Sequence, residues 1–177
     1  SIGCTPAELT WKAGVDVLCL GATKCGALCA EVVIFFNRDL AETFSHRRKR
    51  SGHLLSKGRL FGAQMAGWLK DNHWLDLALH ANSQATALAS QICSYDGVKL
   101  AWPVQSNELF VIMPKALAQY LRKAGAEFYD WYESTSPPGT VLTEDQTYVR
   151  LVTSFATQDS QREEFCGLIN RYFSDAC

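Results

Sequence analysis

Lys24 is the residue whose type and neighbours point most directly to covalent chemistry. It lies in "DVLCLGATKCGAL" (16–28), where an apolar run ends among small residues and no acidic residue is close in sequence. A lysine on a loop after a strand can form a Schiff base with a carbonyl compound or with pyridoxal phosphate, if small neighbours let a flat ring approach. An isolated lysine in a glycine-rich turn is more often a surface residue, so these residues alone leave both interpretations open.

Arg150 is the second candidate, because it interrupts the apolar run "TYVRLVTSFAT" (147–157). The planar fork of an arginine suits bidentate binding of a carboxylate, so Arg150 is either paired in the interior or presented to a ligand. An arginine on an edge strand that reaches solvent is an equally good interpretation of the pattern.

A basic segment, "HRRKRSGHLLSKGR" (46–59), is the third feature. Such a run could bind nucleic acid, act as a localisation signal or hold a phosphate, although it is most often a solvated helix face. "SGH" interrupts the basic run, so we expect Ser56 and Lys57 near the start of the next helix, where backbone N–H groups favour an anion.

The histidines and cysteines form no recognisable catalytic or metal-binding pattern. The seven cysteines are an odd number, and no second Cys or His pair follows Cys25 and Cys29 at zinc spacing. We therefore expect no metal, and cysteines that are mostly buried and reduced, as in a cytoplasmic protein.

Composition narrows the classes of partner. The chain has 177 residues, of which 47% are hydrophobic and 20% charged, and its formal net charge is −1. This is enough for one or two modest globular units, and the charge argues against binding nucleic acid through bulk electrostatics. No apolar run approaches the roughly 18 residues that span a bilayer. We expect neither a nucleic-acid nor a membrane partner.

The elements that must position these residues follow from local patterns. "TPAE" (5–8) predicts a helix start with a capping box. The apolar runs 15–20 and 30–36 predict strands of the kind buried on both faces of a largely parallel α/β sheet. Helical spacing then extends from residue 38 to 92, with breaks at "SGHLLSKGR" (51–59) and near 70–73.

The pattern changes at the turn "YDG" (95–97). Beyond it the sequence predicts four strands, a loop at 134–146, a helix that ends at Gly125, and a last helix that Thr157 caps. We place a domain boundary there, with an α/β piece at 1–95 and a small α+β unit at 96–177. Because the first piece has only two clear strands, we expect a chain truncated at its amino end.

Taken in order, these segments resemble one family closely. "CTPAELTWKAGVDVLCLGATKCG", "EVVIFFNRDLAETFSHRRKRSGHLLSKGRLFGAQ", "WLDLALHAN", "SNELF" and "VRLVTSFAT" are similar to the carboxyl-terminal half of low-specificity L-threonine aldolase. The family's S-F-G-x-T-K-N-G motif is matched by residues 19–26, with cysteine in place of its serine and its asparagine. The resemblance implies the aspartate-aminotransferase fold (fold type I), here as a truncated large domain followed by the small domain.

The resemblance also implies roles. Lys24 would bond to pyridoxal 5'-phosphate, and Thr23 would help to place this cofactor. Lys49 and Lys57 would contact the cofactor phosphate or the substrate, and Arg150 would bind the substrate carboxylate. The implied reaction cleaves L-threonine or L-allo-threonine to glycine and an aldehyde, in a cytoplasmic homo-oligomer, a dimer or tetramer.

One family motif is not found in the chain. The H-x-D-G-A-R motif, which carries the aspartate that pairs with the cofactor nitrogen, precedes the matched region. We therefore expect the 177 residues alone to be inactive and to need a longer chain or a complementary amino-terminal segment. Two alternatives stay open: another fold type I enzyme that performs β-elimination or racemisation, and a non-catalytic interaction module that uses the basic run.

Overall fold

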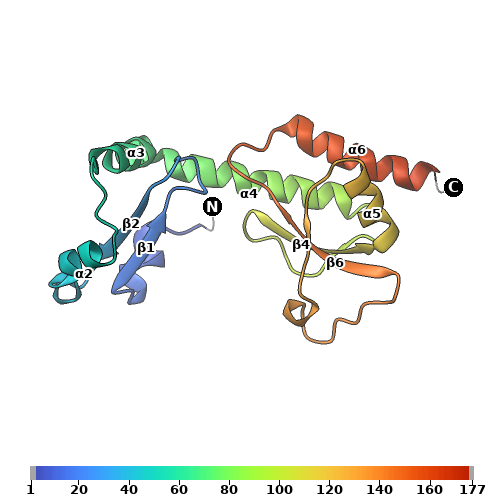
Figure 1. The fold of residues 1–177 in the computed structure, drawn as a ribbon. Coiled ribbons are helices and arrows are strands. Elements are labelled where there is room, and N and C mark those ends of the chain that lie inside the picture. The colour runs from blue at the N-terminus through green and yellow to red at the C-terminus, as the bar shows by residue number, and fades with distance from the viewer. Residues whose placement is uncertain (1–2, 176–177) are drawn as a thin grey trace. The chain divides into compact units, whose positions relative to one another are not determined.

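The computed structural model describes residues 3–175, and the chain forms two compact units, Ser1–Leu77 and Ala78–Cys177 (Figure 1). The division falls within helix α4 (His73–Ile92). The change of pattern at the turn 95–97 predicts a domain boundary near residue 95 instead, and that boundary stays a prediction.

The first unit begins with the expected capped helix, α1 (Pro6–Leu9). The Thr5 hydroxyl accepts a hydrogen bond from the backbone N–H of Glu8, and the Glu8 carboxylate accepts one from the backbone N–H of Thr5. This reciprocal pair satisfies two donors that a helix start otherwise leaves free. A 3-10 helix, Trp11–Ala13, follows and ends at Gly14, whose φ is 92°.

Strands β1 (Val17–Gly21) and β2 (Glu31–Phe35) pair antiparallel over five residues each, with Cys19 opposite Val33. The expectation of a parallel arrangement is wrong for this pair. A loop of nine residues joins the strands, whereas parallel neighbours need a longer crossover. Burial alternates along β1, and Val17 and Val33 are each more than one third exposed, so the predicted burial on both faces is also absent here.

The helical stretch of the first unit is interrupted where the sequence predicted breaks. It comprises a 3-10 helix at Arg38–Ala41, α2 (Phe44–Arg50) and α3 (Arg59–Leu69). A further 3-10 turn, Lys70–Asn72, separates α3 from α4, and Asp71 and Asn72 have φ values of 53° and 61°. Asp and Asn tolerate this left-handed conformation better than most residues, so the chain can turn here.

The second unit contains a four-stranded antiparallel sheet in the order β3-β4-β6-β5. The strands are β3 (Lys99–Leu100), β4 (Glu108–Pro114), β5 (Tyr129–Asp130) and β6 (Gln146–Val152). The predicted strands at 98–102 and 126–131 are present but shorter than expected. The central pair is β4 and β6, which places Phe110 opposite Arg150.

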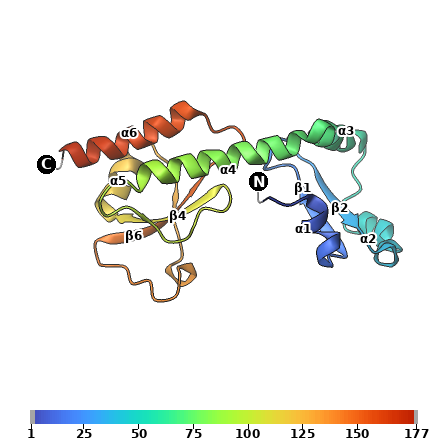
Figure 2. The ribbon, with the colours of Figure 1, turned by 180° about the vertical axis from the view of Figure 1, so that it is seen from behind.

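Helices α5 (Lys115–Lys123), α6 (Asp159–Asp175) and the second part of α4 lie on one side of this sheet (Figures 1 and 2). The core between helices and sheet is built from fully buried residues, among them Leu109, Val111, Leu117, Leu121, Val149 and Ile169. α5 is followed by Gly125 with a φ of 99°, as the sequence predicted.

The start of α6 differs from the prediction. The hydroxyl of Thr157 accepts a hydrogen bond from the Ser154 N–H, while the Gln161 side chain accepts one from the Gln158 N–H. Thr157 therefore does not cap the helix as predicted, and Gln161 bonds the N–H of Gln158, the residue just before α6. Within residues 3–175 no helix combines the length and apolarity needed to cross a bilayer.

Candidate active site

Lys24 lies in the loop between β1 and β2, where the backbone forms its own hydrogen bonds. Ala22 donates to the Ala30 carbonyl at 2.9 Å, and the Ala22 carbonyl accepts from Cys25 and Ala27 at 3.0 Å each. Ala22 and Ala30 are almost completely buried, and Lys24 is exposed. The small residues therefore form the base of the loop and present the lysine to solvent.

Helix α3 holds this loop through two polar side chains. The Gln64 Oε1 accepts hydrogen bonds from the N–H groups of Leu28 and Cys29, at 3.1 and 2.9 Å. The indole Nε1 of Trp68 donates to the Cys25 carbonyl at 2.6 Å. Trp68 and Met65 also form a small buried cluster with the two alanines. The bonds from α3 thus hold the loop after Lys24, and the buried cluster holds Ala22 before it.

Thr23 is used by the loop itself. Its hydroxyl donates to Glu31 Oε1 at 2.7 Å and accepts from the Ala30 N–H at 3.1 Å. The carboxylate of Glu31 lies so close to Gly21 that a Cβ at this position would overlap it. Because these atoms are the far end of a flexible side chain, Glu31 can shift to make room, so the overlap does not by itself require glycine at position 21. A contact between Thr23 and a cofactor stays a prediction.

Cys25, directly after the lysine, is half-buried, and this burial raises the pKa of its thiol above the ordinary value. All six cysteines in the described part of the chain are free, and Cys177 lies outside it. None of the six is buried, so the expectation of mostly buried cysteines is wrong. Four of them lie in strands, loops or turns that this chain leaves open to solvent: Cys4, Cys19, Cys29 and Cys93.

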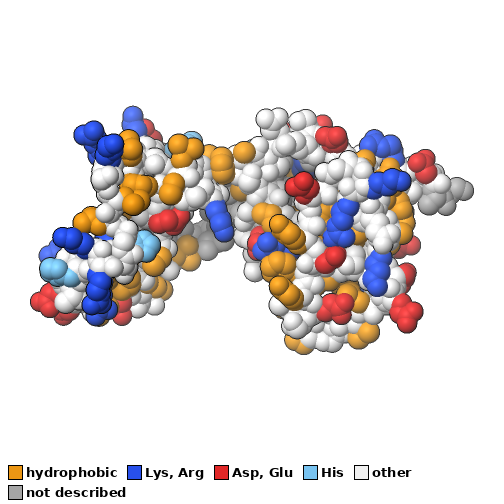
Figure 3. Space-filling view, viewed as in Figure 1, with side chains coloured by type: hydrophobic (Ala, Val, Ile, Leu, Met, Phe, Trp, Pro, Cys, Tyr) orange, Lys and Arg blue, Asp and Glu red, His pale blue; other side chains and the backbone are white. Residues whose placement is uncertain are grey.

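Lys49 and Lys57 flank the break in the basic segment. Lys49 is exposed on α2, where Lys and Arg side chains gather at the surface (Figure 3). Lys57 lies in the turn just before α3 and has a φ of 59°. A non-glycine residue in this left-handed region is uncommon, and such residues are concentrated at functional positions. The predicted place of Lys57 near a helix start is confirmed.

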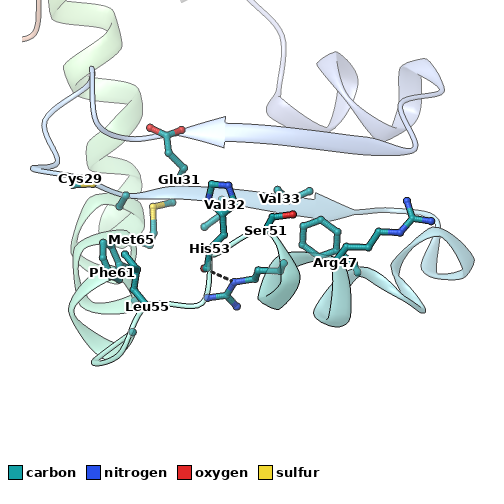
Figure 4. Close-up of a pocket in the computed structure, with 15 residues that line it drawn as sticks. Cys29, Glu31, Val32, Val33, Arg47, Ser51, His53, Leu55, Phe61 and Met65 are labelled. Atoms are coloured by element: carbon teal, nitrogen blue, oxygen red, sulfur yellow. Dashed lines mark hydrogen bonds between the residues drawn. The ribbon is translucent and has the colours of Figure 1, made fainter.

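An open groove of about 740 Å³ lies between β2, α2 and α3 (Figure 4). Phe61, Met65 and Leu55 gather at one end, and Arg47 extends at the other. The Nε of Arg48 donates to the His53 carbonyl at 3.1 Å, which closes the break after α2. His53 thus has a structural partner in the basic segment.

Arg150 is placed on the helix-free face of the second unit's sheet. It lies on β6, an inner strand between β4 and β5, so the edge-strand interpretation is wrong. Its Nη1 contacts Glu108 Oε1 at 3.2 Å, and its guanidinium lies 4.0 Å from the ring centroid of Trp131. Its Nε is buried and has no hydrogen-bond partner among the described residues. A buried unpaired donor is costly, and a carboxylate ligand is the partner that a guanidinium suits best.

Asn107, to which the sequence assigned no role, joins two strands. Its Nδ2 donates to the Thr153 carbonyl at 2.7 Å, and the Thr153 N–H donates to the Asn107 carbonyl at 3.0 Å. The Thr153 hydroxyl, itself buried, donates to the Ala81 carbonyl of α4 at 2.7 Å. These bonds fix the end of β6 that follows Arg150.

The residues present suit a pyridoxal phosphate cofactor. Lys24 offers an exposed amine, on a loop held by hydrogen bonds, to the aldehyde of the cofactor. Arg150 bears on the substrate instead, because its unpaired Nε is a donor that a carboxylate suits. Within residues 3–175 no three His, Cys, Asp or Glu side chains are grouped so that they could hold a metal ion.

Solved structures define the class of fold. The chain is similar to a threonine aldolase from Leishmania major, with 30% identity and a TM-score of 0.79, over 89% of this chain and 43% of that one. It is also similar to a serine palmitoyltransferase from Sphingomonas wittichii, with 19% identity and a TM-score of 0.58, over 89% of this chain and 39% of that one. The fold is part of fold type I of the pyridoxal-phosphate-dependent enzymes, as expected.

Relatives with curated names show which fold type I enzymes the sequence resembles most specifically. The sequence is 47% identical to a low specificity L-threonine aldolase of a Pseudomonas species, over 75% of this chain and 38% of that protein. It is 48% identical to the Pseudomonas aeruginosa protein of the same name, over 72% of this chain and 37% of that protein. No family model matches the sequence. The resemblance to low-specificity L-threonine aldolase is confirmed, and the chain spans less than two fifths of these relatives' length.

The residues that support the candidates differ in how far the sequence could have predicted them. Gln64 and Trp68 gave no signal, because their helical spacing marks them only as members of an amphipathic helix. Glu108 could have been found, because alternation along "SNELF" places it on the same face as Phe110, opposite Arg150. Lys24, Thr23, Lys49 and Lys57 belong to the first unit and Arg150 to the second.

Proposed function

We propose that this protein is a pyridoxal-phosphate-dependent aldolase that cleaves L-threonine and L-allo-threonine to glycine and an aldehyde. The observation that carries the proposal is the 47–48% identity to two low specificity L-threonine aldolases. The rigid loop that exposes Lys24 supports it, because covalent attachment of a cofactor needs an accessible amine on a fixed backbone.

Lys24 would bond covalently to the cofactor, Thr23 would contact it, and Lys49 and Lys57 would bind its phosphate or the substrate. When bound, pyridoxal phosphate supplies an electron sink for negative charge on the α-carbon of an amino acid. The left-handed backbone of Lys57 supports a functional role for this residue, because such strain persists where the surrounding structure requires it.

Arg150 would hold the substrate through its carboxylate. A guanidinium that Trp131 and Glu108 keep in place can fix the direction in which the bond from the α-carbon to the β-carbon points. Such positioning lowers the barrier, because the substrate no longer has to find the reactive orientation.

The assembly is proposed as a homo-oligomer in the cytoplasm, either a dimer or a tetramer. In this arrangement Lys49 and Lys57 would reach the active site of a neighbouring subunit. Their exposure on α2 and in the turn before α3 leaves both side chains available for such a contact.

Product analysis tests the function. A longer protein that also carries the family's amino-terminal segment, supplied with pyridoxal phosphate and L-threonine, should form glycine and acetaldehyde in equal amounts. Borohydride reduction should leave a pyridoxyl group on the peptide that contains Lys24. Lys24→Ala should lose both results, and Lys12→Ala, a substitution of another exposed lysine of the first unit, should keep them.

The outcomes separate the alternatives. Release of ammonia and a keto acid would indicate β-elimination, and inversion at the α-carbon would indicate racemisation. A protein that never binds the cofactor, but binds RNA through its basic segment at moderate salt, would be an interaction module instead.

A further inference from the structure

The contacts around Arg150 draw attention to Glu108, a residue that has no role of its own in the proposed reaction. The ion pair of Glu108 with Arg150 joins residues 42 positions apart, and both side chains are about one quarter to one third exposed. The strand register explains the contact. Phe110 lies opposite Arg150, so Glu108, two residues earlier, is its diagonal neighbour on the same face of the sheet.

Trp131 completes the surroundings of the guanidinium. The backbone N–H of Trp131 donates to the Tyr148 carbonyl at 2.7 Å, which fixes this residue beside β6. The guanidinium of Arg150 then lies over the Trp131 ring, and Phe110 packs against the same ring with centroids 6.0 Å apart. Arg150 is therefore held from two directions: its plane by an aromatic ring and its Nη1 by a carboxylate.

The contacts of Arg150 with Trp131 and Glu108 leave the Nε edge of its guanidinium without a hydrogen-bond partner among the described residues. Glu108 takes Nη1, while Nε is buried and has no hydrogen-bond partner within the described part of the chain. In a guanidinium, Nε and the other terminal nitrogen donate in parallel along one edge, which matches the two oxygens of a carboxylate. An arginine held in this way is prepared to bind a carboxylate without first becoming ordered.

We propose that Glu108, together with Trp131, forms a clamp that orients Arg150 for the carboxylate of an amino-acid ligand, so that Glu108 is a positioning residue. The proposal rests on the proposed function for the identity of the ligand. The clamp itself is a property of the second unit. The proposal requires that Glu108 acts through its hydrogen bond to Arg150, and not as a negative charge that competes with the ligand's carboxylate for this arginine.

A pair of substitutions separates these two roles. Glu108→Gln keeps an oxygen that can accept from Nη1 and removes the charge, whereas Glu108→Ala removes both. The loss of a hydrogen bond to a charged group costs about tenfold in binding. In the longer protein that carries the amino-terminal segment and is loaded with pyridoxal phosphate, Glu108→Ala should raise the Kd of glycine and the KM of L-threonine about tenfold, and Glu108→Gln by less than about threefold.

Asp130→Ala is the matched control. Asp130 directly precedes Trp131 and pairs with Arg122, which also lies over an aromatic ring, that of Phe128, so this variant breaks a similar ion pair close to the clamp without removing a group that contacts Arg150. It should leave the Kd of glycine unchanged. Tighter or unchanged glycine binding in Glu108→Ala, or equal losses in Glu108→Ala and Glu108→Gln, would overturn the proposal.

A second measurement does not depend on activity. The Nε–H signal of Arg150, assigned by its loss in Arg150→Lys, should exchange slowly with water in the cofactor-free chain. Glu108→Ala should speed this exchange about tenfold and Glu108→Gln should change it little, because the hydrogen bond holds the guanidinium in place. Fast exchange in the unsubstituted chain would overturn the clamp. Slow exchange together with no threonine cleavage by the longer, cofactor-loaded protein would overturn only the proposed function.

Discussion

The indole Nε1 of Trp68 donates a 2.6 Å hydrogen bond to the carbonyl of Cys25, the residue that follows Lys24. The two residues are 43 positions apart, and Trp68 is only 6% exposed. This bond connects the buried cluster under α3 to the backbone of the loop that presents the lysine. Rigidity of the Lys24 loop thus depends on a helix that carries no candidate catalytic side chain.

Trp68→Phe should loosen this loop without removing the aromatic packing. Loss of one partly buried hydrogen bond should lower the free energy of unfolding by about 1 kcal/mol. Amide hydrogen exchange should become faster in residues 22–27. Trp11→Phe, which changes an exposed tryptophan of the same unit, should change neither quantity. Unaltered exchange in the Trp68 variant would contradict this role.

Arg150→Lys should impair binding of the substrate carboxylate, because lysine has neither the planar fork nor the same fit over Trp131. We expect the KM of L-threonine to rise about 10- to 100-fold, from the loss of hydrogen bonds between charged groups. Steady-state kinetics of the cofactor-loaded protein measures this change. Arg122→Lys, at an arginine that also pairs with a carboxylate and an aromatic ring, should keep the KM; a parallel rise there would argue against a specific role for Arg150.

Acid should destabilise the second unit through Asp159. The hydrogen bond from Gln84, then the hydrogen bond and charge of Arg162, lower the pKa of Asp159 below its ordinary value. A carboxyl group with a lowered pKa in the folded state stabilises that state above its unfolded pKa of about 3.9, and this contribution is lost as the pH falls through the lowered pKa.

When the pH falls from 5 to roughly 2–3, Asp159→Asn should therefore lose less thermal stability than the unsubstituted chain does. Thermal unfolding followed by circular dichroism at several pH values measures it. Glu163→Gln removes one negative charge from the same helix at an exposed position without a hydrogen-bond partner in the described structure. An equal effect in both variants would show that net charge, and not the bonds of Asp159, is responsible.

Thr153→Val should destabilise the sheet of the second unit. The hydroxyl of Thr153 is buried and bonds the Ala81 carbonyl, so valine keeps the shape and removes the bond. The free energy of unfolding should fall by about 1–2 kcal/mol, as measured by urea denaturation. Thr153→Ser, which keeps the hydroxyl, should lose less than the valine variant; the reverse order would mean that packing of the methyl group matters more than the bond.

Local patterns predicted what depends on near neighbours. The capping box of Thr5 and Glu8, the glycine after α5 and the break between α3 and α4 all occur where the sequence placed them. Each depends on residues only a few positions apart, so spacing alone was enough. The fold type, and the prediction that Lys24 bonds to the cofactor, came from the resemblance of several motifs, taken in order, to one family; no single motif would have supported either.

Only the tertiary structure decided how the candidates are held. The antiparallel pairing of β1 and β2, the inner position of β6 and the contacts of Trp68 and Glu108 join segments that are far apart or depend on strand register. Hydrophobic patterns show which residues avoid water but not which strand they pair with. For this reason the sequence could name Lys24 and Arg150, while the support of each by a distant tryptophan or glutamate appeared only once the chain was folded.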